Sequence, residues 1–194
     1  MEFQDVVRRR RMVRRFTDEP VSDESLQRIM RNAVRGPSAG FSQGQGFLVL
    51  TGEPLERLRN FEWWAAEETK AAPAVVIPFS AKDVYLDRYA QPDKGWTDRS
   101  EDHWPVPYWD IDTGMAALLI LQTAVDEGLG AVFFGLGKDQ WPGLREEFGV
   151  PDIYVPIGMI AIGHPAEEGV SEGASPLTRM RKRFDEMVHW GQWK

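Results

Sequence analysis

The first two hydrophobic patterns of the chain have helical spacing. Phe3, Val6, Val7 and then Val13 form an imperfect stripe that runs into a basic segment, and Pro20 closes this first element. A second helix is better defined, because Ser22 is a suitable N-cap and one face carries Leu26, Ile29, Met30 and Ala33, ahead of a Gly-Pro pair at 36–37. Both segments are therefore predicted to be helices.

The middle of the chain alternates between strand and loop patterns. Glycine and small polar residues predict a loop over 36–46, a strand over 47–51 follows it, and residues 74–79 read as a buried strand. Residues 53–70 between the two strands read as helical. Segment 83–109 contains three prolines and is predicted to be irregular, which makes it a candidate lid or substrate loop.

The most hydrophobic helix is predicted over 113–127, opened by Asp110 and Asp112. Its apolar residues go almost all the way round, so it belongs in a core or an interface and favours a dimer. The remaining elements are a short strand at 131–134, a helix at 140–148, a strand at 154–162 interrupted by Pro156 and Gly158, and an extended C-terminal arm at 165–194. Unequal helices between three or four strands favour a single α+β domain over 1–194, and not a doubly wound sheet.

Composition narrows the classes of function. With 42% hydrophobic and 27% charged residues the chain is typical of a globular protein, and with no cysteine it has no disulfide, thiolate metal site or thiol nucleophile. The start has no signal-like hydrophobic region and the longest apolar run is too short to span a bilayer, so we expect a cytoplasmic protein with no membrane partner. The net charge of −7 disfavours nucleic acid as a partner.

The basic residues are unevenly distributed in this acidic chain. Six of the 23 Lys and Arg residues lie between Arg8 and Arg15, and four more lie between Arg179 and Arg183. At helical spacing, Arg10, Arg11 and Arg14 would reach a single anion, and a guanidinium suits a phosphate. The alternative interpretation of the same run is a solvated basic face or a nucleic-acid patch.

Several familiar chemical motifs are absent. The glycines of segment 128–137 follow a helix and precede a strand, which is the reverse of a dinucleotide fingerprint, and Gly137-Lys138 lacks the other residues of a phosphate loop. The three histidines lack the spacing of metal ligands, so no metal site is predicted; His103 could donate a proton to a substrate, or be merely structural. No catalytic triad is evident, and a chain without its own reactive group is a natural host for a cofactor.

Three ordered motifs resemble the nitroreductase family of flavin enzymes. They are RRMVRRFTDEPVSDESLQRIMRNAVRGPSAGFSQ near the start, EGLGAVFFGLG at 127–137, and RKRFDEMVHW at 181–190. The resemblance covers nearly the whole chain except the segment 83–109. It implies an α+β fold with a central mixed or antiparallel sheet flanked by helices, in an intertwined homodimer whose C-terminal arms wrap the partner.

The resemblance also implies a cofactor and its contacts. Bound FMN would pass hydride equivalents from NADH or NADPH to a nitroaromatic, quinone or flavin by a ping-pong mechanism. The residues implied in cofactor binding are Arg10, Arg11, Met12, Arg14, Ser38 (from the other subunit), Phe133, Phe134, Gly135, Arg181 and Arg183. Met12 stands where the family commonly has Ser, Phe41 replaces a usual Asn, and Gly44-Gln45 stands where Pro-Trp is common.

Aromatic residues are concentrated in the predicted lid. We assign Trp104 and Tyr108, together with Phe41, to the substrate pocket, where they could stack on a planar acceptor or a nicotinamide; the alternative is that the lid aromatics simply fill the core. Other possibilities on the same fold are a deazaflavin-using, dehalogenating or flavin-fragmenting enzyme and a non-catalytic flavin-binding carrier or redox sensor. No amino-acid side chain is assigned a catalytic role, because the flavin would carry the chemistry.

Overall fold

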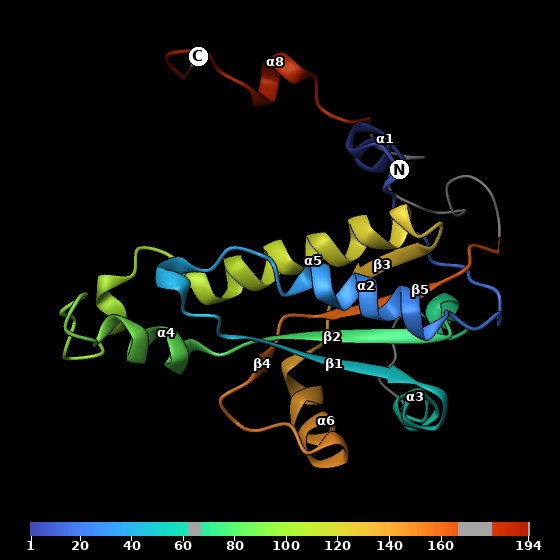
Figure 1. Cartoon of the computed structure of the whole chain (residues 1–194), viewed down its shortest axis with the longest axis horizontal. Helices are drawn as coiled ribbons and strands as arrows, with labels where there is room; N and C mark the ends of the chain where they lie inside the picture. Colours follow the sequence, from blue (N-terminus) through green and yellow to red (C-terminus); the bar gives the residue numbers. More distant parts are fainter. Residues whose placement is uncertain (62–66, 167–179, 194) are drawn as a thin grey trace.

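The computed structural model describes residues 1–61, 67–166 and 180–193 and is built on one antiparallel sheet (Figure 1). The strand order is β1-β2-β5-β3, and the short β4 pairs with β2 beyond the end of β5. Every pair of neighbouring strands is antiparallel, so the predicted α+β class is confirmed. The strands are β1 (Gln45–Thr51), β2 (Ala74–Ser80), β3 (Gly130–Phe134), β4 (Val155–Pro156) and β5 (Met159–Gly163).

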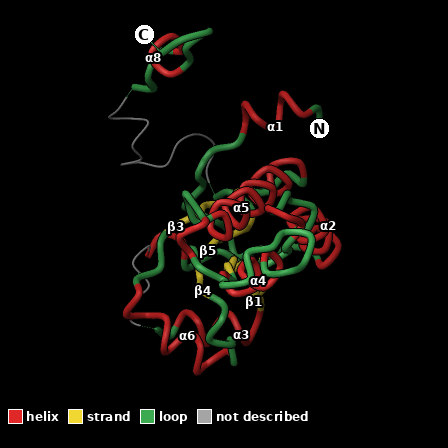
Figure 2. The backbone as a smooth tube through the Cα atoms, turned by 90° about the vertical axis from the view of Figure 1, so that its left-hand side faces the viewer, coloured by secondary structure: helices red, strands yellow, loops and turns green. Residues whose placement is uncertain are grey.

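Helices cover both faces of this sheet (Figures 1 and 2). Helices α2 and α5 pack on one face of the sheet and α3 and α6 on the other. In the view of Figure 1, α3 and α6 lie below β1 and β2, and α4 lies beyond one end of the sheet. The helices are α1 (Phe3–Arg9), α2 (Asp23–Ala33), α3 (Gly52–Arg59), α4 (Lys82–Tyr89), α5 (Tyr108–Asp126), α6 (Trp141–Phe148) and α8 (Phe184–Met187).

The central strand β2 is buried along its whole length and separates two hydrophobic cores. Ala74 and Val76 contribute to the core under α2 and α5, while Val75, Ile77 and Phe79 contribute to the core over α3 and α6. This division follows from the pleat, because successive side chains of a strand point to opposite faces. A strand buried on both faces reads as a continuous hydrophobic run, which is why β2 was predictable within one residue.

Helix α2 confirms its predicted N-cap. The Ser22 side chain accepts a hydrogen bond from the Ser25 backbone N–H, and Leu26, Ile29 and Ala33 are buried against α5. Helix α5 buries one face and leaves a stripe formed by Ile111, Met115 and Leu118 exposed, between 37 and 45% of each residue. The prediction that this hydrophobic helix needs a further partner therefore applies to the exposed stripe alone.

Three helix boundaries were predicted wrongly, the first being that of α1, which ends at Arg9 and does not run on toward Pro20. The predicted helix over 53–70 is shorter, because α3 ends at Arg59, whose guanidinium Nη2 donates to the Ala72 carbonyl 2.6 Å away within the chain that leads to β2. Residues 62–66 lie outside the described residues. Helix α5 begins at Tyr108, five residues earlier than predicted, because Pro107 occupies the N-cap and the two aspartates lie inside the helix.

The prolines of segment 83–109 predicted an irregular segment, but part of it is helical. Helix α4 spans its first part, because Tyr85 and Leu86 are buried and all three prolines lie after the helix. The interruption predicted in the last strand is confirmed: Pro156 ends β4 and Gly158, with φ of 153°, separates it from β5. A side chain at Gly158 would overlap the Phe133 ring and the Phe134 carbonyl oxygen.

The C-terminal arm predicted over 165–194 is described only in part, since residues 167–179 and 194 lie outside the described residues. Its described portion, 180–193, carries the short α8 and stands away from the body of the molecule (Figures 1 and 2).

Candidate functional site

The basic run near the N-terminus leaves the helix and becomes an extended strap over residues 10–16. Met12 forms a parallel bridge with Ala131 of β3, the Val13 N–H donates to the Ala131 carbonyl at 3.0 Å, and Phe16 bridges Pro165. Helical spacing therefore does not bring Arg10, Arg11 and Arg14 together, contrary to the prediction. The reason is that backbone pairing with β3 competes with continuation of α1 past Arg9.

Arginines from both ends of the chain nevertheless line a cavity of about 560 Å³. Arg10 and Arg11 line it together with Arg181, so two of the predicted N-terminal arginines and one of the C-terminal ones meet there. Arg14 and Arg183 do not line it, and Arg183 pairs with Asp185. We refer to it as the arginine cavity; its other lining residues are Met1, Arg8, Arg9, Val13, Val125, Gly128, Leu129, Gly130 and Pro165.

The electrostatics of the arginine cavity favour an anion. Arg8 pairs with Asp5, but within the described parts of the chain Arg10, Arg11 and Arg181 have no carboxylate partner. The Nη1 of Arg10 is also buried without a hydrogen-bond partner among the described residues. A buried guanidinium nitrogen without an acceptor is costly, so an incoming phosphate or carboxylate would satisfy it.

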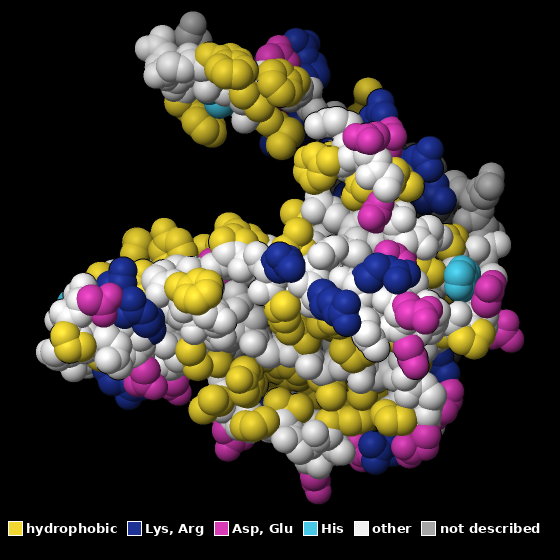
Figure 3. All heavy atoms as spheres, in the orientation of Figure 1, with side chains coloured by type: hydrophobic (Ala, Val, Ile, Leu, Met, Phe, Trp, Pro, Cys, Tyr) yellow, Lys and Arg dark blue, Asp and Glu magenta, His cyan; other side chains and the backbone are white. Residues whose placement is uncertain are grey.

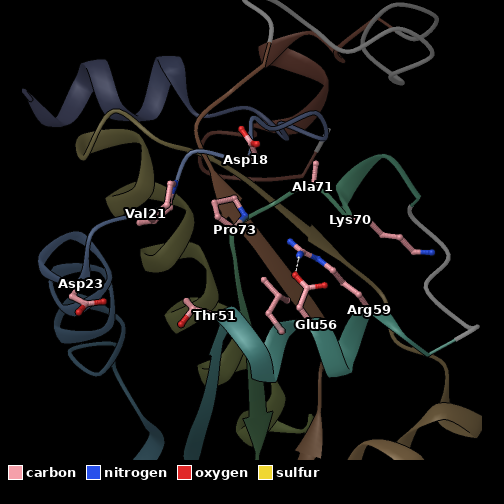
Figure 4. Close-up of a pocket in the computed structure, with 12 residues that line it drawn as sticks. Asp18, Val21, Asp23, Thr51, Glu56, Arg59, Lys70, Ala71 and Pro73 are labelled. Atoms are coloured by element: carbon pink, nitrogen blue, oxygen red, sulfur yellow. Dashed lines mark hydrogen bonds and ion pairs between the residues drawn. The ribbon is translucent and has the colours of Figure 1, made fainter.

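A second cavity, of about 550 Å³, lies between α2, α3 and the start of β2 and has the opposite character (Figure 4). Asp18, Asp23 and Glu56 line it, and its Arg59 already binds Glu56 and the Ala72 carbonyl. An anion there would face three carboxylates against two cations, Lys70 and an Arg59 that is already engaged, so the arginine cavity is the better phosphate site.

Strand β3 connects the arginine cavity to the predicted ring-binding residues. Gly130, at the start of the strand, lines the cavity, and Phe133 and Phe134, at its end, are half-buried. Gly135 follows the strand and is exposed. Of the three residues expected near a flavin ring, two thus end β3 and the third follows it directly, beyond the cavity.

The remaining predicted residues lie at the opposite end of α5. Ser38 and Phe41 belong to the loop between α2 and β1, whose Ala39 N–H donates to Asp112 near the start of α5, whereas Val125 near its end lines the arginine cavity. Thirteen residues of α-helix correspond to about 20 Å. One chain therefore does not bring Ser38 and Phe41 to the arginine cavity.

The aromatic residues of the predicted lid pack mainly on one another. The Trp104 ring has five aromatic neighbours within 4.5–6.1 Å between centroids: Tyr85, Tyr89, Trp96, Tyr108 and Trp109. Of the residues assigned to the substrate pocket, Trp104 thus lies inside this cluster, Tyr108 is 36% exposed, and Phe41 is 77% exposed. These ring contacts favour the packing alternative for Trp104, and the assignment of all three residues to the substrate pocket stays a prediction.

The buried carboxylate of Asp112 links the loop before β1 to α4 and α5. The sequence predicted only that this residue begins a helix. Asp112 is 3% exposed, and its Oδ2 accepts hydrogen bonds from the Ala39 N–H at 2.8 Å and the Tyr85 hydroxyl at 2.9 Å. Burial, and next the bond to Asp112, raise the pKa of Tyr85, so its hydroxyl stays protonated and keeps donating. The only sequence signal for this role was the pair of aspartates at 110 and 112 ahead of a hydrophobic helix.

Two absences hold for the described residues, 1–61, 67–166 and 180–193. Among their helices none combines the length and hydrophobicity needed to cross a membrane. Among their His, Asp and Glu side chains no group of three is placed to hold a metal ion.

Comparison with known proteins gives a consistent family. The chain is 29% identical over 197 residues to a protein of Methanothermobacter thermautotrophicus assigned as an NADH dehydrogenase/NAD(P)H nitroreductase, covering 100% of this chain and 88% of the relative. It is 24% identical over 190 residues to an NADPH-dependent oxidoreductase of Staphylococcus aureus, covering 97% and 73%.

The fold has close structural neighbours as well. A nitroreductase structure from Exiguobacterium sibiricum, solved in complex with FMN, superposes with a TM-score of 0.75 at 21% identity and covers 98% of this chain and 97% of that one. The sequence model of the nitroreductase family matches residues 7–164. The chain therefore belongs to the nitroreductase family.

Proposed function

We propose that this protein is an FMN-dependent oxidoreductase that uses NADH or NADPH to reduce a small organic acceptor. The observation that carries the proposal is the arginine cavity, where Arg10, Arg11 and Arg181 converge without carboxylate partners in the described chain. Family membership supports it, as do the names of the two relatives and the FMN found in the neighbouring structure.

The residues present fit the phosphate end of FMN. A phosphate offers acceptor oxygens to several guanidinium groups at once, and the unpartnered Nη1 of Arg10 needs such an acceptor. Arg10, Arg11 and Arg181 would hold the phosphate, and Arg14 and Arg183, which do not line the cavity, would contribute less. The backbone of Met12, which is paired with β3, is the remaining contact proposed for the strap.

The chain itself supplies binding and positioning. The chemistry that FMN provides when bound is two-electron transfer from NADH or NADPH to an acceptor such as a nitroaromatic, a quinone or a flavin, in a ping-pong sequence. Phe133, Phe134 and Gly135 would lie along the ring, where backbone N–H groups can stabilise negative charge. The half-buried phenylalanines would also exclude water from that side.

A homodimer would complete the site. Because Ser38, Phe41 and Tyr108 lie at the other end of α5 from the arginine cavity, a second chain must supply them if all act on one flavin. The exposed stripe of Ile111, Met115 and Leu118 runs between these two ends, and hydrophobic side chains lie along this edge and on the facing C-terminal segment (Figure 3). Two chains packed antiparallel along the stripe would bring the loop of one to the cavity of the other.

The open edge of β1 suits the same arrangement. Among the described residues β1 pairs with β2 alone, so its other edge offers backbone groups to which an extended arm could add. The described part of the arm carries five exposed large hydrophobic residues that would need cover: Met180, Phe184, Met187, Trp190 and Trp193. A cytoplasmic location forms part of the same proposal.

Mixing the purified protein with FMN tests the proposal directly. We expect a bound yellow chromophore that NADH or NADPH bleaches without oxygen and that a quinone such as menadione restores. Protein that stays colourless after mixing with FMN would refute flavin binding. Protein that binds FMN but is not bleached by either nucleotide would instead be a flavin carrier.

A further inference from the structure

The loop between α2 and β1 is held in an unfavourable backbone conformation. Within residues 36–44, here called the 36–44 loop, Gly40, Phe41 and Gln43 have φ of 61°, 54° and 55°. Glycine adopts this left-handed region without cost, but a bulky residue such as Phe41 is an outlier there. Phe41 is also 77% exposed, so packing within the chain does not compensate for the strain.

Contacts from α4 and α5 hold the loop in this shape. The Ala39 N–H donates to buried Asp112 at 2.8 Å, and the Arg88 Nε donates to the Gly40 carbonyl at 3.0 Å. Tyr85 donates to the same carboxylate oxygen at 2.9 Å. Strained backbone of this kind is found where the surroundings over-determine it, and commonly at ligand sites.

Two glycines allow α4 to press directly on the loop. A Cβ at Gly40 would lie 2.5 Å from the Tyr89 ring, and a Cβ at Gly44 would lie 2.6 Å from the Tyr85 ring. The Ala81 N–H, just before α4, donates to the Gly44 carbonyl at 2.8 Å. The loop is thus fixed by side chains that belong to the segment first interpreted as a lid.

We propose that Asp112 and Tyr85 are positioning residues, which hold the 36–44 loop in its strained shape so that Phe41 presents its ring to a planar aromatic acceptor. This inference rests on the proposed function and deepens it. Neither residue touches the acceptor. Asp112 acts through the Ala39 N–H, and Tyr85 acts by completing the hydrogen bonds of the Asp112 carboxylate.

The decisive variant replaces the carboxylate with a side chain of similar size. Asp112→Leu removes the acceptor for Ala39 and should raise the KM for menadione at least tenfold while kcat changes less than threefold, since the loop shapes binding more than chemistry. Asp112→Asn keeps an oxygen that can accept from Ala39 and should restore the KM to within about threefold.

Asp110→Asn is the matched control. Asp110 lies two residues earlier in α5 and accepts a hydrogen bond from the Ser80 hydroxyl at 2.6 Å, so it also ties the start of α5 to the body. It makes no hydrogen bond to the 36–44 loop among the contacts of the described residues. We expect its menadione KM to stay within twofold of the wild type.

Hydrogen exchange of the protein without FMN gives a readout independent of activity. Amide exchange at Ala39 should accelerate at least tenfold in Asp112→Leu and stay unchanged in Asp110→Asn. If Asp112→Leu does not fold, Tyr85→Phe, which removes only a hydroxyl, should still accelerate exchange in peptides from the loop.

The outcomes separate the two proposals. Wild-type protein that fails to bind FMN refutes the proposed function, whereas the exchange measurement still decides whether Asp112 holds the loop. Equal exchange and equal menadione KM in the Asp112→Leu and Asp110→Asn variants would overturn the inference. Unchanged exchange in Tyr85→Phe would overturn the part assigned to Tyr85.

Discussion

Arg28 of α2 donates two hydrogen bonds to the carboxylate of Glu127, which follows α5 directly. They are 2.7 Å long from Nε and 2.6 Å long from Nη2. The Ser25 hydroxyl donates to the same carboxylate at 2.9 Å. These bonds fasten the start of α2 to the end of α5, the two helices that cover one face of the sheet.

This arrangement makes stability depend on pH. The hydrogen bond from Arg28, followed by that from Ser25, lowers the pKa of Glu127 below its ordinary value. A carboxyl whose pKa is lower in the folded state stabilises the fold fully above its unfolded pKa of about 4.3, and that contribution is lost as the pH falls through the folded pKa. We expect Glu127→Gln to lower the melting temperature at pH 7.

The difference between the two proteins should shrink as the pH drops below about 4.3. Thermal unfolding followed at a series of pH values measures this. Glu146→Gln is a suitable control, because Glu146 is exposed on α6 and has no ion pair within the described residues. Equal melting temperatures of Glu127→Gln and wild type at pH 7 would contradict the prediction.

Local signals predicted most of the fold. Ser22 and the spacing of Leu26, Ile29 and Ala33 were enough for α2, and the hydrophobic run of β2 was enough for a buried strand. Helix α4 was missed because its pattern is weak: only Tyr85 and Leu86 are buried, and its stability comes from aromatic neighbours that lie distant in sequence. Tertiary packing overrode local propensity there.

The site was less predictable than the fold. The arginines at 10 and 11 and at 181 could be paired through a family resemblance, but their convergence depends on the strap pairing with β3, which no local pattern specifies. The division between Arg10, which lines the cavity, and Arg14, which does not, follows from the same extended backbone. Asp112 was unrecognisable because its role depends on a loop 73 residues away.

The different positions of Arg10 and Arg14 relative to the cavity give a prediction on the affinity for FMN. Losing a hydrogen bond to a charged group costs about 1.5–3 kcal/mol, so Arg10→Gln and Arg181→Gln should each raise the Kd for FMN about tenfold or more. Arg14→Gln and Arg183→Gln should have smaller effects, because neither residue lines the cavity and Arg183 already pairs with Asp185. Quenching of flavin fluorescence measures all four.

Arg31→Gln controls for the change in net charge, since Arg31 is exposed on α2 and does not line the arginine cavity. Its Kd should equal that of the wild type. A ranking in which Arg14→Gln is more harmful than Arg10→Gln would show that the phosphate lies elsewhere along the strap.

The position of the strap itself depends on the absence of a side chain at Gly130. A Cβ there would lie 2.8 Å from Val13 Cβ and Cγ1, too close for any ordinary contact. Overpacking of this kind typically costs about 1–3 kcal/mol, so Gly130→Ala should destabilise the fold and, by displacing Arg10 and Arg11, weaken FMN binding.

The double variant Gly130→Ala, Val13→Ala is the internal control, because the smaller residue 13 removes the overlap. Urea unfolding should show the pair less destabilised than the sum of the single variants, with a coupling free energy of about 1 kcal/mol. Strict additivity would mean that the strap does not rest on Gly130 in solution.

The exposed stripe of α5 predicts how the chains associate. Leu118 is 45% exposed and lies between the two ends of α5 that the proposed composite site requires. A charge placed in the centre of an apolar interface loses its hydration without gaining a partner, so Leu118→Arg should weaken the dimer by at least about tenfold and release monomers. Ile153→Arg, at a residue 47% exposed in the turn before β4, should leave the dimer intact. Light scattering after size-exclusion chromatography measures the mass of each variant.

The same variant links the dimer to activity. In a monomer the 36–44 loop and the arginine cavity are separated by the length of α5, so Leu118→Arg should lose menadione reduction in parallel with the dimer. A fully active monomer would show that one chain holds the whole site.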